Sequence, residues 1–217
     1  MENFENLFYT TGMKRFLMII IFGIVLISSS GVANSIDLPW KKEQPQVELD
    51  ETSQQARILY AQNDIDAALK LLKSKGELTR TAEDWLLIGN ILQDKDRIDE
   101  AIYMYKKSIE VDPKYYKAHY NLGYIYLSQD KPNMALAEFK QAVKYKDNFA
   151  YGYYNMGCAY LALKQYRNAR YNFYKALDIK GDEPSIYYNL AYTYKMLNNE
   201  KQAKTYYDLY NKLIERQ

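Results

Sequence analysis

Apolar and polar residues follow a helical rhythm along most of the chain. From Ala82 to Gln217, apolar side chains recur three, four and seven residues apart in successive blocks, and polar turns such as SQDKPN and LNNEKQ separate the blocks. This spacing places the apolar residues of each block on one face of a helix. The pattern therefore predicts pairs of helices joined by short turns.

Three short segments of this region almost repeat one another. They are AHYNLGYIY from residue 118, GYYNMGCAY from residue 152 and IYYNLAYTY from residue 186, so the interval between their starts is constant. Catalytic motifs are not usually tiled at a fixed period, whereas structural modules are. The period therefore indicates a repeated structural unit.

A frame of 34 positions, starting at residues 82, 116, 150 and 184, shows what recurs. Position 8 is small, position 20 is alanine, and position 24 is aromatic: Gly89, Gly123, Gly157 and Ala191; Ala101, Ala135, Ala169 and Ala203; Tyr105, Phe139, Phe173 and Tyr207. Small residues let two helices approach to about 8–10 Å, and the rings fill the space beside them. One hairpin cannot bury its apolar face alone, so the hairpins are expected to stack.

These positions resemble the tetratricopeptide repeat family, in which a small residue at position 8 and alanine at position 20 are characteristic. The resemblance implies an all-α fold, a right-handed α-solenoid of stacked antiparallel helical hairpins. It divides the chain into a divergent first hairpin at 51–81 and repeats at 82–115, 116–149, 150–183 and 184–217. In the divergent hairpin, Ala56, Ala68 and Leu72 take positions 8, 20 and 24, and its spacing to the next repeat is one position shorter than the others.

In this family the first helix of each hairpin lines the concave surface. The resemblance therefore implies a peptide-binding groove at repeat positions 5, 6 and 9, formed by Tyr120, Asn121, Tyr124, Tyr154, Asn155, Tyr188, Asn189 and Tyr192. Groove asparagines in other members hold peptide backbones, and an amide offers both a donor and an acceptor. Two alternatives remain open: the asparagines bond to their own helix or its neighbours, and the tyrosines stack on one another and stiffen the solenoid.

Composition argues against catalysis and against nucleic acid as a partner. The chain has one cysteine and one histidine, so neither an internal disulfide nor a histidine-based metal site is expected. No glycine-rich phosphate loop or nucleophile motif is present in the sequence, and the net charge is only +2. We therefore predict a non-enzymatic interaction scaffold without cofactor, metal or catalytic residues, whose partner is a protein or an extended peptide.

A structural role is the alternative. The last predicted helix carries Tyr206, Tyr210 and Leu213 along one edge. An exposed apolar edge of this kind favours association with another chain. The alternative function is thus self-assembly into a homo-oligomer through the C-terminal helix.

Residues 1–33 contain the layout of an export signal. Lys14 and Arg15 precede an unbroken apolar run from Phe16 to Ile27, and small or polar residues follow up to Ala33. Two interpretations remain open: a signal cut before Asn34, giving a periplasmic or secreted protein, or a signal-anchor that keeps residues 16–33 in the membrane. The start at Met1 or Met13 is also open, and residues 34–50 are predicted to be a linker.

Overall fold

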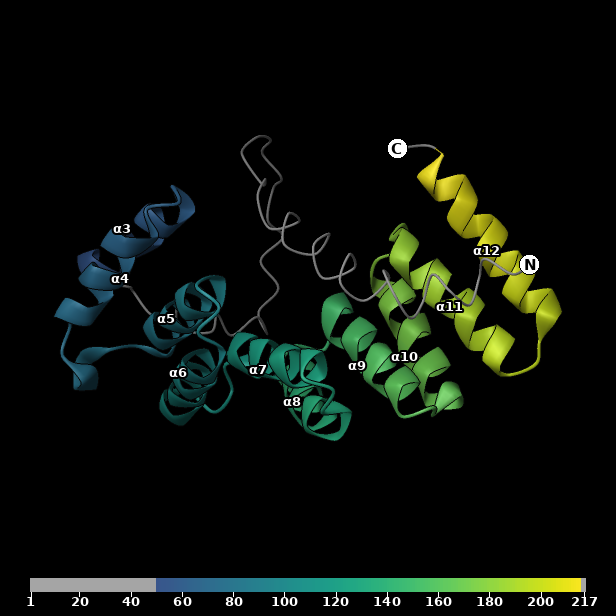
Figure 1. Ribbon diagram of the computed structural model, residues 1–217, viewed down its shortest axis with the longest axis horizontal. Coiled ribbons are helices and arrows are strands. Elements are labelled where there is room, and N and C mark those ends of the chain that lie inside the picture. Colours follow the sequence, from purple (N-terminus) through teal and green to yellow (C-terminus); the bar gives the residue numbers. More distant parts are fainter. Residues whose placement is uncertain (1–49, 216–217) are drawn as a thin grey trace, which may run out of the picture. The chain divides into compact units, whose positions relative to one another are not determined.

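The computed structural model describes residues 50–215 (Figure 1). The predicted export signal and nearly all of the predicted linker, residues 1–49, lie outside the described residues, as do residues 216–217. The described part contains ten α-helices and one short 3-10 helix: α3 (Glu51–Ala61), α4 (Ile65–Ser74), η2 (Glu77–Thr79), α5 (Ala82–Asp94), α6 (Ile98–Val111), α7 (Tyr116–Ser128), α8 (Pro132–Tyr145), α9 (Ala150–Ala162), α10 (Tyr166–Ile179), α11 (Pro184–Met196) and α12 (Glu200–Ile214). None of the helices between residues 50 and 215 combines the length and apolar character that a membrane span requires.

The helices pack as five hairpins. Helix α3 packs against α4, α5 against α6, α7 against α8, α9 against α10, and α11 against α12. The second helix of each hairpin also contacts the first helix of the next, so the hairpins form a stack. First helices touch one another as well, because α5 contacts α3, and α9 contacts both α7 and α11. The predicted fold class, an all-α stack of helical hairpins, is confirmed.

The turn inside every hairpin uses the same backbone conformation at position 15. Five residues there have φ between 55° and 63°: Asn63, Asp96, Asp130, Lys164 and Asn198. Asparagine and aspartate adopt this left-handed conformation more readily than most residues. After α7, the N–H of Lys131 donates to the carbonyl oxygen of Tyr126 at 2.8 Å, and that of Asp130 donates to Leu127 at 3.1 Å. This pair of bonds ends the first helix and lets the chain reverse.

The small residues lie where the two helices of a hairpin come closest. A Cβ atom added to Gly123 would lie 2.8 Å from the ring of Phe139, and one added to Gly157 would lie 2.5 Å from the ring of Phe173. Ala135 and Phe139 are fully buried beside them. The interpretation of positions 8, 20 and 24 as the hairpin core is therefore confirmed for the repeats that begin at residues 82, 116 and 150, whereas Tyr207 at position 24 of the last repeat is half-buried.

Replacing Gly123 with leucine is expected to lower the free energy of unfolding by about 1–3 kcal/mol or more, because the new side chain would force α7 and α8 apart. Urea unfolding followed by circular dichroism measures the loss. The control is Gly181→Ala, where the added Cβ would find its nearest neighbour, the carbonyl oxygen of Leu177, at 3.8 Å. An unchanged urea midpoint for the Gly123 variant would contradict the assigned helix contact.

Candidate functional site

Helices α7, α9 and α11 share one surface, which we call the first-helix face. It comprises repeat positions 2, 5, 9, 12 and 13 of three successive hairpins: Lys117, Tyr120, Tyr124, Leu127 and Ser128; Tyr151, Tyr154, Cys158, Leu161 and Ala162; Ser185, Tyr188, Tyr192, Lys195 and Met196. Because α9 contacts both α7 and α11, equivalent positions of the three helices are neighbours. The face is thus continuous from one hairpin to the next.

Several apolar side chains on this face remain open to solvent. Tyr151 is 43% exposed and Met196 is 38% exposed, and Ala162 is exposed too. Four more are half-buried: Tyr124, Leu127, Leu161 and Tyr192. Aromatic side chains of this kind supply a large contact area when a partner covers them.

The Tyr-Asn pairs of the three recurring segments link neighbouring hairpins. The side-chain amide of Asn155 donates a hydrogen bond to the hydroxyl oxygen of Tyr120 at 3.0 Å. Asn189 donates in the same way to Tyr154 at 2.9 Å. In both cases position 6 of one repeat bonds to position 5 of the preceding repeat. We call this set of contacts the Tyr-Asn ladder.

The ladder is buried, which corrects the placement expected from the sequence. Asn155 is 4% exposed, Asn189 is 9% exposed and Tyr154 is 8% exposed, so the expectation that they open into the groove is wrong for these three residues. The reason is that position 6 lies between adjacent first helices, where the tyrosine of the preceding hairpin meets it. Burial also raises the pKa of the Tyr120 and Tyr154 hydroxyls.

The hydrogen-bond partner of the asparagine differs at the boundary with the repeat of residues 82–115. Position 5 of that repeat is Leu86, which offers no hydrogen-bonding group. The amide of Asn121 donates instead to the side-chain oxygen of Asn90 at 2.8 Å. The hydroxyl of Tyr105 lies 2.8 Å from the same oxygen. All three asparagines of the Tyr-Asn motif are therefore engaged within the stack, as the alternative interpretation anticipated.

The remaining predicted groove residues are half-buried, four of them on the first-helix face and Asn121 at position 6 beside it. They are Tyr120, Asn121, Tyr124, Tyr188 and Tyr192. The ring centre of Tyr188 lies 5.3 Å from that of Tyr210, so tyrosines also pack on one another. Peptide binding by these residues stays a prediction.

Cys158 lies in the middle of the same face, at position 9 of α9. Burial raises the pKa of its thiol to about 12. A thiol with such a pKa is almost entirely protonated at neutral pH, and the thiolate is the reactive form. Cys158 therefore contributes a small apolar surface rather than a nucleophile.

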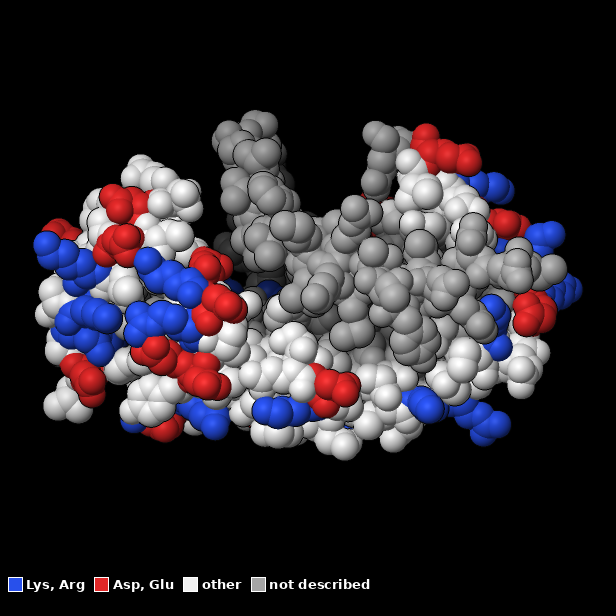
Figure 2. All heavy atoms as spheres, viewed as in Figure 1, with Lys and Arg blue, Asp and Glu red and all other residues white. Residues whose placement is uncertain are grey.

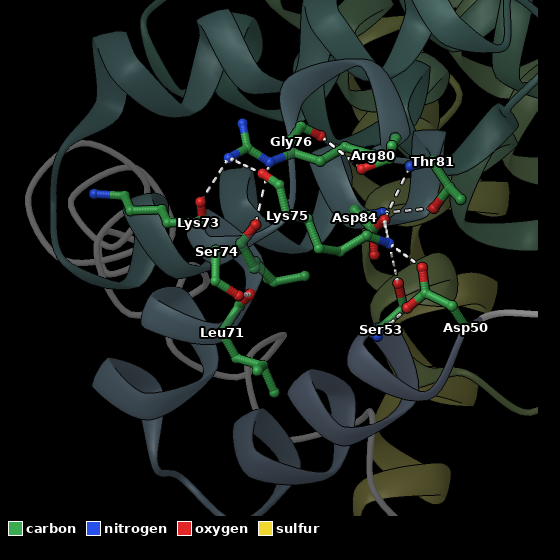
Figure 3. A network of polar contacts seen from close by, with 12 residues as sticks. Asp50, Ser53, Leu71, Lys73, Ser74, Lys75, Gly76, Arg80, Thr81 and Asp84 are labelled. Carbon is green, nitrogen blue, oxygen red and sulfur yellow. Dashed lines mark hydrogen bonds and ion pairs between the residues drawn. The ribbon is translucent and has the colours of Figure 1, made fainter.

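The described residues also form a buried polar cluster that sequence analysis missed, shown in Figure 3. The ammonium of Lys75 lies 2.6 Å from a carboxylate oxygen of Asp84, 2.6 Å from one of Asp50 and 2.6 Å from the hydroxyl of Ser53. The side chains of Lys75 and Asp84 are only 7% and 2% exposed. Burial lowers the pKa of Lys75, but its hydrogen bonds to the two carboxylates outweigh this and raise the pKa. We call these residues the junction cluster.

Arg80 completes the junction between the divergent hairpin and α5 (Figure 3). Its guanidinium donates to the carbonyl oxygens of Leu72, Lys73 and Lys75 at 3.1, 3.2 and 2.9 Å and thereby caps the end of α4. It also lies 4.7 Å from the ring centre of Trp85, a cation–π distance. One part of the junction has a recognisable sequence signal: Thr81 and Asp84 form a capping box at the start of α5.

The one histidine of the chain is engaged in hydrogen bonds. The two ring nitrogens of buried His119 lie 2.7 Å from a carboxylate oxygen of Glu138 and 3.0 Å from the carbonyl oxygen of Pro113. Burial lowers the pKa of His119, but these two hydrogen bonds outweigh it and raise the pKa. Within residues 50–215, no group of three or more His, Cys, Asp or Glu side chains is placed to hold a metal ion.

Protein-family models match the repeats of this chain. A family described as TPR repeat matches residues 89–130, and one described as Tetratricopeptide repeat matches 116–149, 150–183 and 184–216. Together these matches cover more than half of the chain. The chain is a tetratricopeptide repeat protein. The last three matched ranges begin at residues 116, 150 and 184, the residues at which α7, α9 and α11 begin.

Solved structures share the fold. The tetratricopeptide stack is similar to residues 41 to the end of MamA from Desulfovibrio magneticus RS-1, with 20% identity and a TM-score of 0.69 over 76% of this chain and 94% of that one. MamA AMB-1 gives 17% identity and a TM-score of 0.69 over 77% of this chain and 99% of that one. No curated protein sequence matches the chain. At these identities the similarity to the solved structures concerns the fold alone. The tetratricopeptide repeat family itself consists of protein-binding modules.

Proposed function

We propose that this tetratricopeptide repeat protein is a non-catalytic interaction scaffold outside the cytoplasm, which binds an extended peptide or protein segment along the first-helix face. The observation that carries the proposal is the set of exposed and half-buried apolar side chains on α7, α9 and α11, above all the exposed Tyr151 and Met196. A fold of this class buries its apolar residues between stacked hairpins. Apolar side chains left open on one continuous face are therefore available to a partner.

The alternative, self-assembly through α12, receives less support. Position 27 is small in the earlier repeats, where Ser108, Ala142 and Ala176 are fully buried. The hydroxyl of Ser108 donates to the carbonyl oxygen of Ala82 at 2.6 Å, in the first helix of the same hairpin. In α12 the same position is Tyr210, which packs on Tyr188 of its own hairpin. Tyr210 is therefore already in contact with its own hairpin.

The predicted exposed edge of α12 is also partly occupied. The hydroxyl of Tyr206 lies 2.7 Å from that of Tyr174, and its ring stacks on Tyr194 at 5.5 Å between centres. Tyr206 therefore belongs to the packing between the last two hairpins. This contact favours the binding scaffold over the self-assembly module.

Replacing Ala162 with arginine is expected to weaken peptide binding without destabilising the stack. Ala162 is exposed at the end of α9, the central one of the three helices of the first-helix face, so a long charged side chain would obstruct the face and leave the core intact. A phage-displayed library of random 12-residue peptides, selected against the full chain, supplies the probes. Fluorescence anisotropy of the selected peptides should show a loss of affinity of about tenfold or more.

The matched control is Ala137→Arg. Ala137 is likewise an exposed alanine, but it lies on α8, a second helix away from the first-helix face. This variant should bind the selected peptides as the unchanged protein does. Equal losses for both variants, or no selectable peptide at all, would refute binding on the first-helix face.

The location outside the cytoplasm rests on the sequence of residues 13–33 alone, with their basic start, apolar run and small residues. If this segment is a cleaved signal, protein recovered from the source cell should begin at Asn34. N-terminal sequencing measures this directly. Mature protein that still contains Met13 would leave the membrane-anchored alternative.

A further inference from the structure

His119 lies at a point where three parts of the chain meet. It is the fourth residue of α7, and its Nδ1 lies 2.7 Å from a carboxylate oxygen of Glu138 on α8. Its Nε2 lies 3.0 Å from the carbonyl oxygen of Pro113, in the connection that enters α7. The side chain of His119 is only 8% exposed. One buried ring therefore holds α7 both to α8 and to the chain before it.

Both partners of this ring are hydrogen-bond acceptors. A carboxylate oxygen and a carbonyl oxygen have no hydrogen to donate, so each of the two bonds needs an N–H group on the imidazole. The neutral ring carries one N–H group, and the protonated ring carries two. Only protonated His119 can therefore make both bonds. Loss of its proton leaves a buried ring nitrogen facing an oxygen with no hydrogen between them, which is costly.

The last repeat makes the same contact with a different donor. Tyr187 occupies position 4 there, as His119 does in its own repeat, and its hydroxyl donates to the carbonyl oxygen of Gly181 at 2.6 Å. Gly181 and Pro113 both occupy position 32 of the repeat that precedes the ring. The ordinary pKa of a tyrosine is 10.0, and burial raises that of Tyr187 further. The contact thus recurs in the stack, and the histidine makes it sensitive to protons near neutral pH.

The groups around His119 favour its protonated form. Burial lowers its pKa, but the hydrogen bonds to Glu138 and Pro113 outweigh burial and raise the pKa above the ordinary value of 6.5. The charge of Glu138 on α8 and that of Asp112 at the end of α6 act in the same direction. The ring of Tyr145, also on α8, lies 6.0 Å away between centres. On α7 itself, no aspartate, glutamate, lysine or arginine stands three or four positions from His119.

His119 has few competitors as a proton-binding group near neutral pH. It is the only histidine of the chain, and histidine is the one side chain whose ordinary pKa lies between about 5 and 8. Burial raises the pKa of the thiol of Cys158 to about 12. Figure 2 shows that charged side chains crowd over α3–α6 on the visible surface, whereas the described surface of α7–α10 is mostly uncharged. The change of charge at His119 therefore falls in a region with few other charges.

We propose that His119, Glu138 and Pro113 form a pH-sensitive clasp at the start of α7. The protonated ring fastens α7 to both partners, and release of its proton removes one of the two contacts. The start of α7 depends on this ring because its N-cap residue, Tyr115, makes no capping hydrogen bond through its side chain. Because α7 forms one edge of the first-helix face, the clasp sets how firmly that edge is held, whether or not the face binds a peptide.

The direction of the pH effect follows from the raised pKa of His119. The folded protein binds this proton more tightly than the unfolded chain does, so protonation stabilises the fold. The stabilisation is complete below the ordinary pKa of 6.5 and is lost as the pH rises through the higher pKa of the folded protein. The equilibrium constant of unfolding should increase about tenfold for each unit by which the two pKa values differ.

Titration of His119 in the full chain is the first test. Because the chain has one histidine, its ring signals in an NMR spectrum of histidine-labelled protein belong to His119. The pKa obtained from these signals should lie above 6.5. It should fall in Glu138→Gln, which keeps a side-chain oxygen but removes the charge. A pKa at or below 6.5 in the unchanged protein, or the same pKa in the variant, would overturn the clasp.

Stability at two pH values is the second test. The urea midpoint of the unchanged protein should be lower at about pH 9 than at about pH 6. His119→Tyr, which copies the donor of the last repeat, should lose this difference, and the control Asn133→Ala, at an exposed position of α8, should keep it. Equal midpoints in the unchanged protein, or a difference that persists in His119→Tyr, would refute the clasp. The NMR titration decides alone if His119→Tyr fails to fold.

Discussion

Replacing both Asn155 and Asn189 with alanine is expected to destabilise the stack strongly. Each substitution removes the amide that donates to a tyrosine hydroxyl, that of Tyr120 or Tyr154. An unsatisfied buried polar group costs about 1–3 kcal/mol, so the free energy of unfolding should fall by about that amount for each of the two changes. Urea unfolding followed by circular dichroism measures the loss, and hydrogen exchange should show faster opening of α9 and α11.

Two further variants isolate the ladder. Asn133→Ala, at an exposed position of α8, measures the small gain that alanine brings as a better helix former. Adding Tyr120→Phe to Asn155→Ala removes both partners of one bond and should cost less than the sum of the single changes. Strict additivity in this cycle, or a double asparagine variant as stable as the unchanged protein, would show that the buried contacts carry no stability.

The ladder variants also separate structure from recognition. If the asparagines held a peptide backbone, their loss would weaken binding while stability stayed the same. The buried hydrogen bonds predict the opposite result. The asparagine variants should be less stable, and they should bind peptide more weakly only under conditions in which the stack unfolds. Binding measured well below the unfolding temperature distinguishes the two cases.

The hairpin core was predictable because its contacts form between residues of one repeat. Position 8 and position 24 belong to the two helices of one hairpin, and their sizes compensate one another, as in Gly123 and Phe139. Four copies in one register made the pattern visible without any structure. Helical spacing and the sizes of side chains were therefore enough to predict stacked helical hairpins, and the resemblance to the tetratricopeptide repeat family implied the solenoid.

The Tyr-Asn ladder was not predictable in the same way. Helical periodicity assigns Asn155 to the side of α9 opposite the hairpin core, but it does not say how closely the preceding hairpin approaches that side. The partner, Tyr120, lies 35 residues earlier, in another repeat. The distance between adjacent first helices decides whether position 6 is covered, and this distance depends on the packing of the whole stack.

The junction cluster escaped prediction for a different reason. The connection around Lys75 falls where the spacing between repeats is one position shorter than elsewhere, so no repeat position could be assigned to it. Ser53 and Asp84 come from two different hairpins, and the ammonium of Lys75 bonds to both. Irregular connections carry contacts that a periodic pattern cannot anticipate.

Replacing Lys75 with methionine is expected to cost about 3–5 kcal/mol, because the change leaves the buried carboxylate of Asp84 without its counter-charge. The N–H of Thr81 still donates to that carboxylate at 2.9 Å, which is too little to balance a charge that is 2% exposed. Since the cluster joins α3 and α4 to α5, the first hairpin should loosen before the rest. Hydrogen exchange should show lost protection in α3 and α4 while α7–α12 keep theirs.

Lys95→Met is the matched control, because Lys95 also links the same two hairpins. Its ammonium lies 2.7 Å from Asp66, but the two side chains are 33% and 88% exposed. An exposed ion pair contributes at most about 1 kcal/mol, so this variant should stay close to the unchanged protein. The double variant Lys75→Met with Asp84→Asn should recover part of the loss, because it removes the buried charge that the single change leaves behind. Equal stability of the Lys75 and Lys95 variants would mean that burial of the cluster does not hold the first hairpin in place.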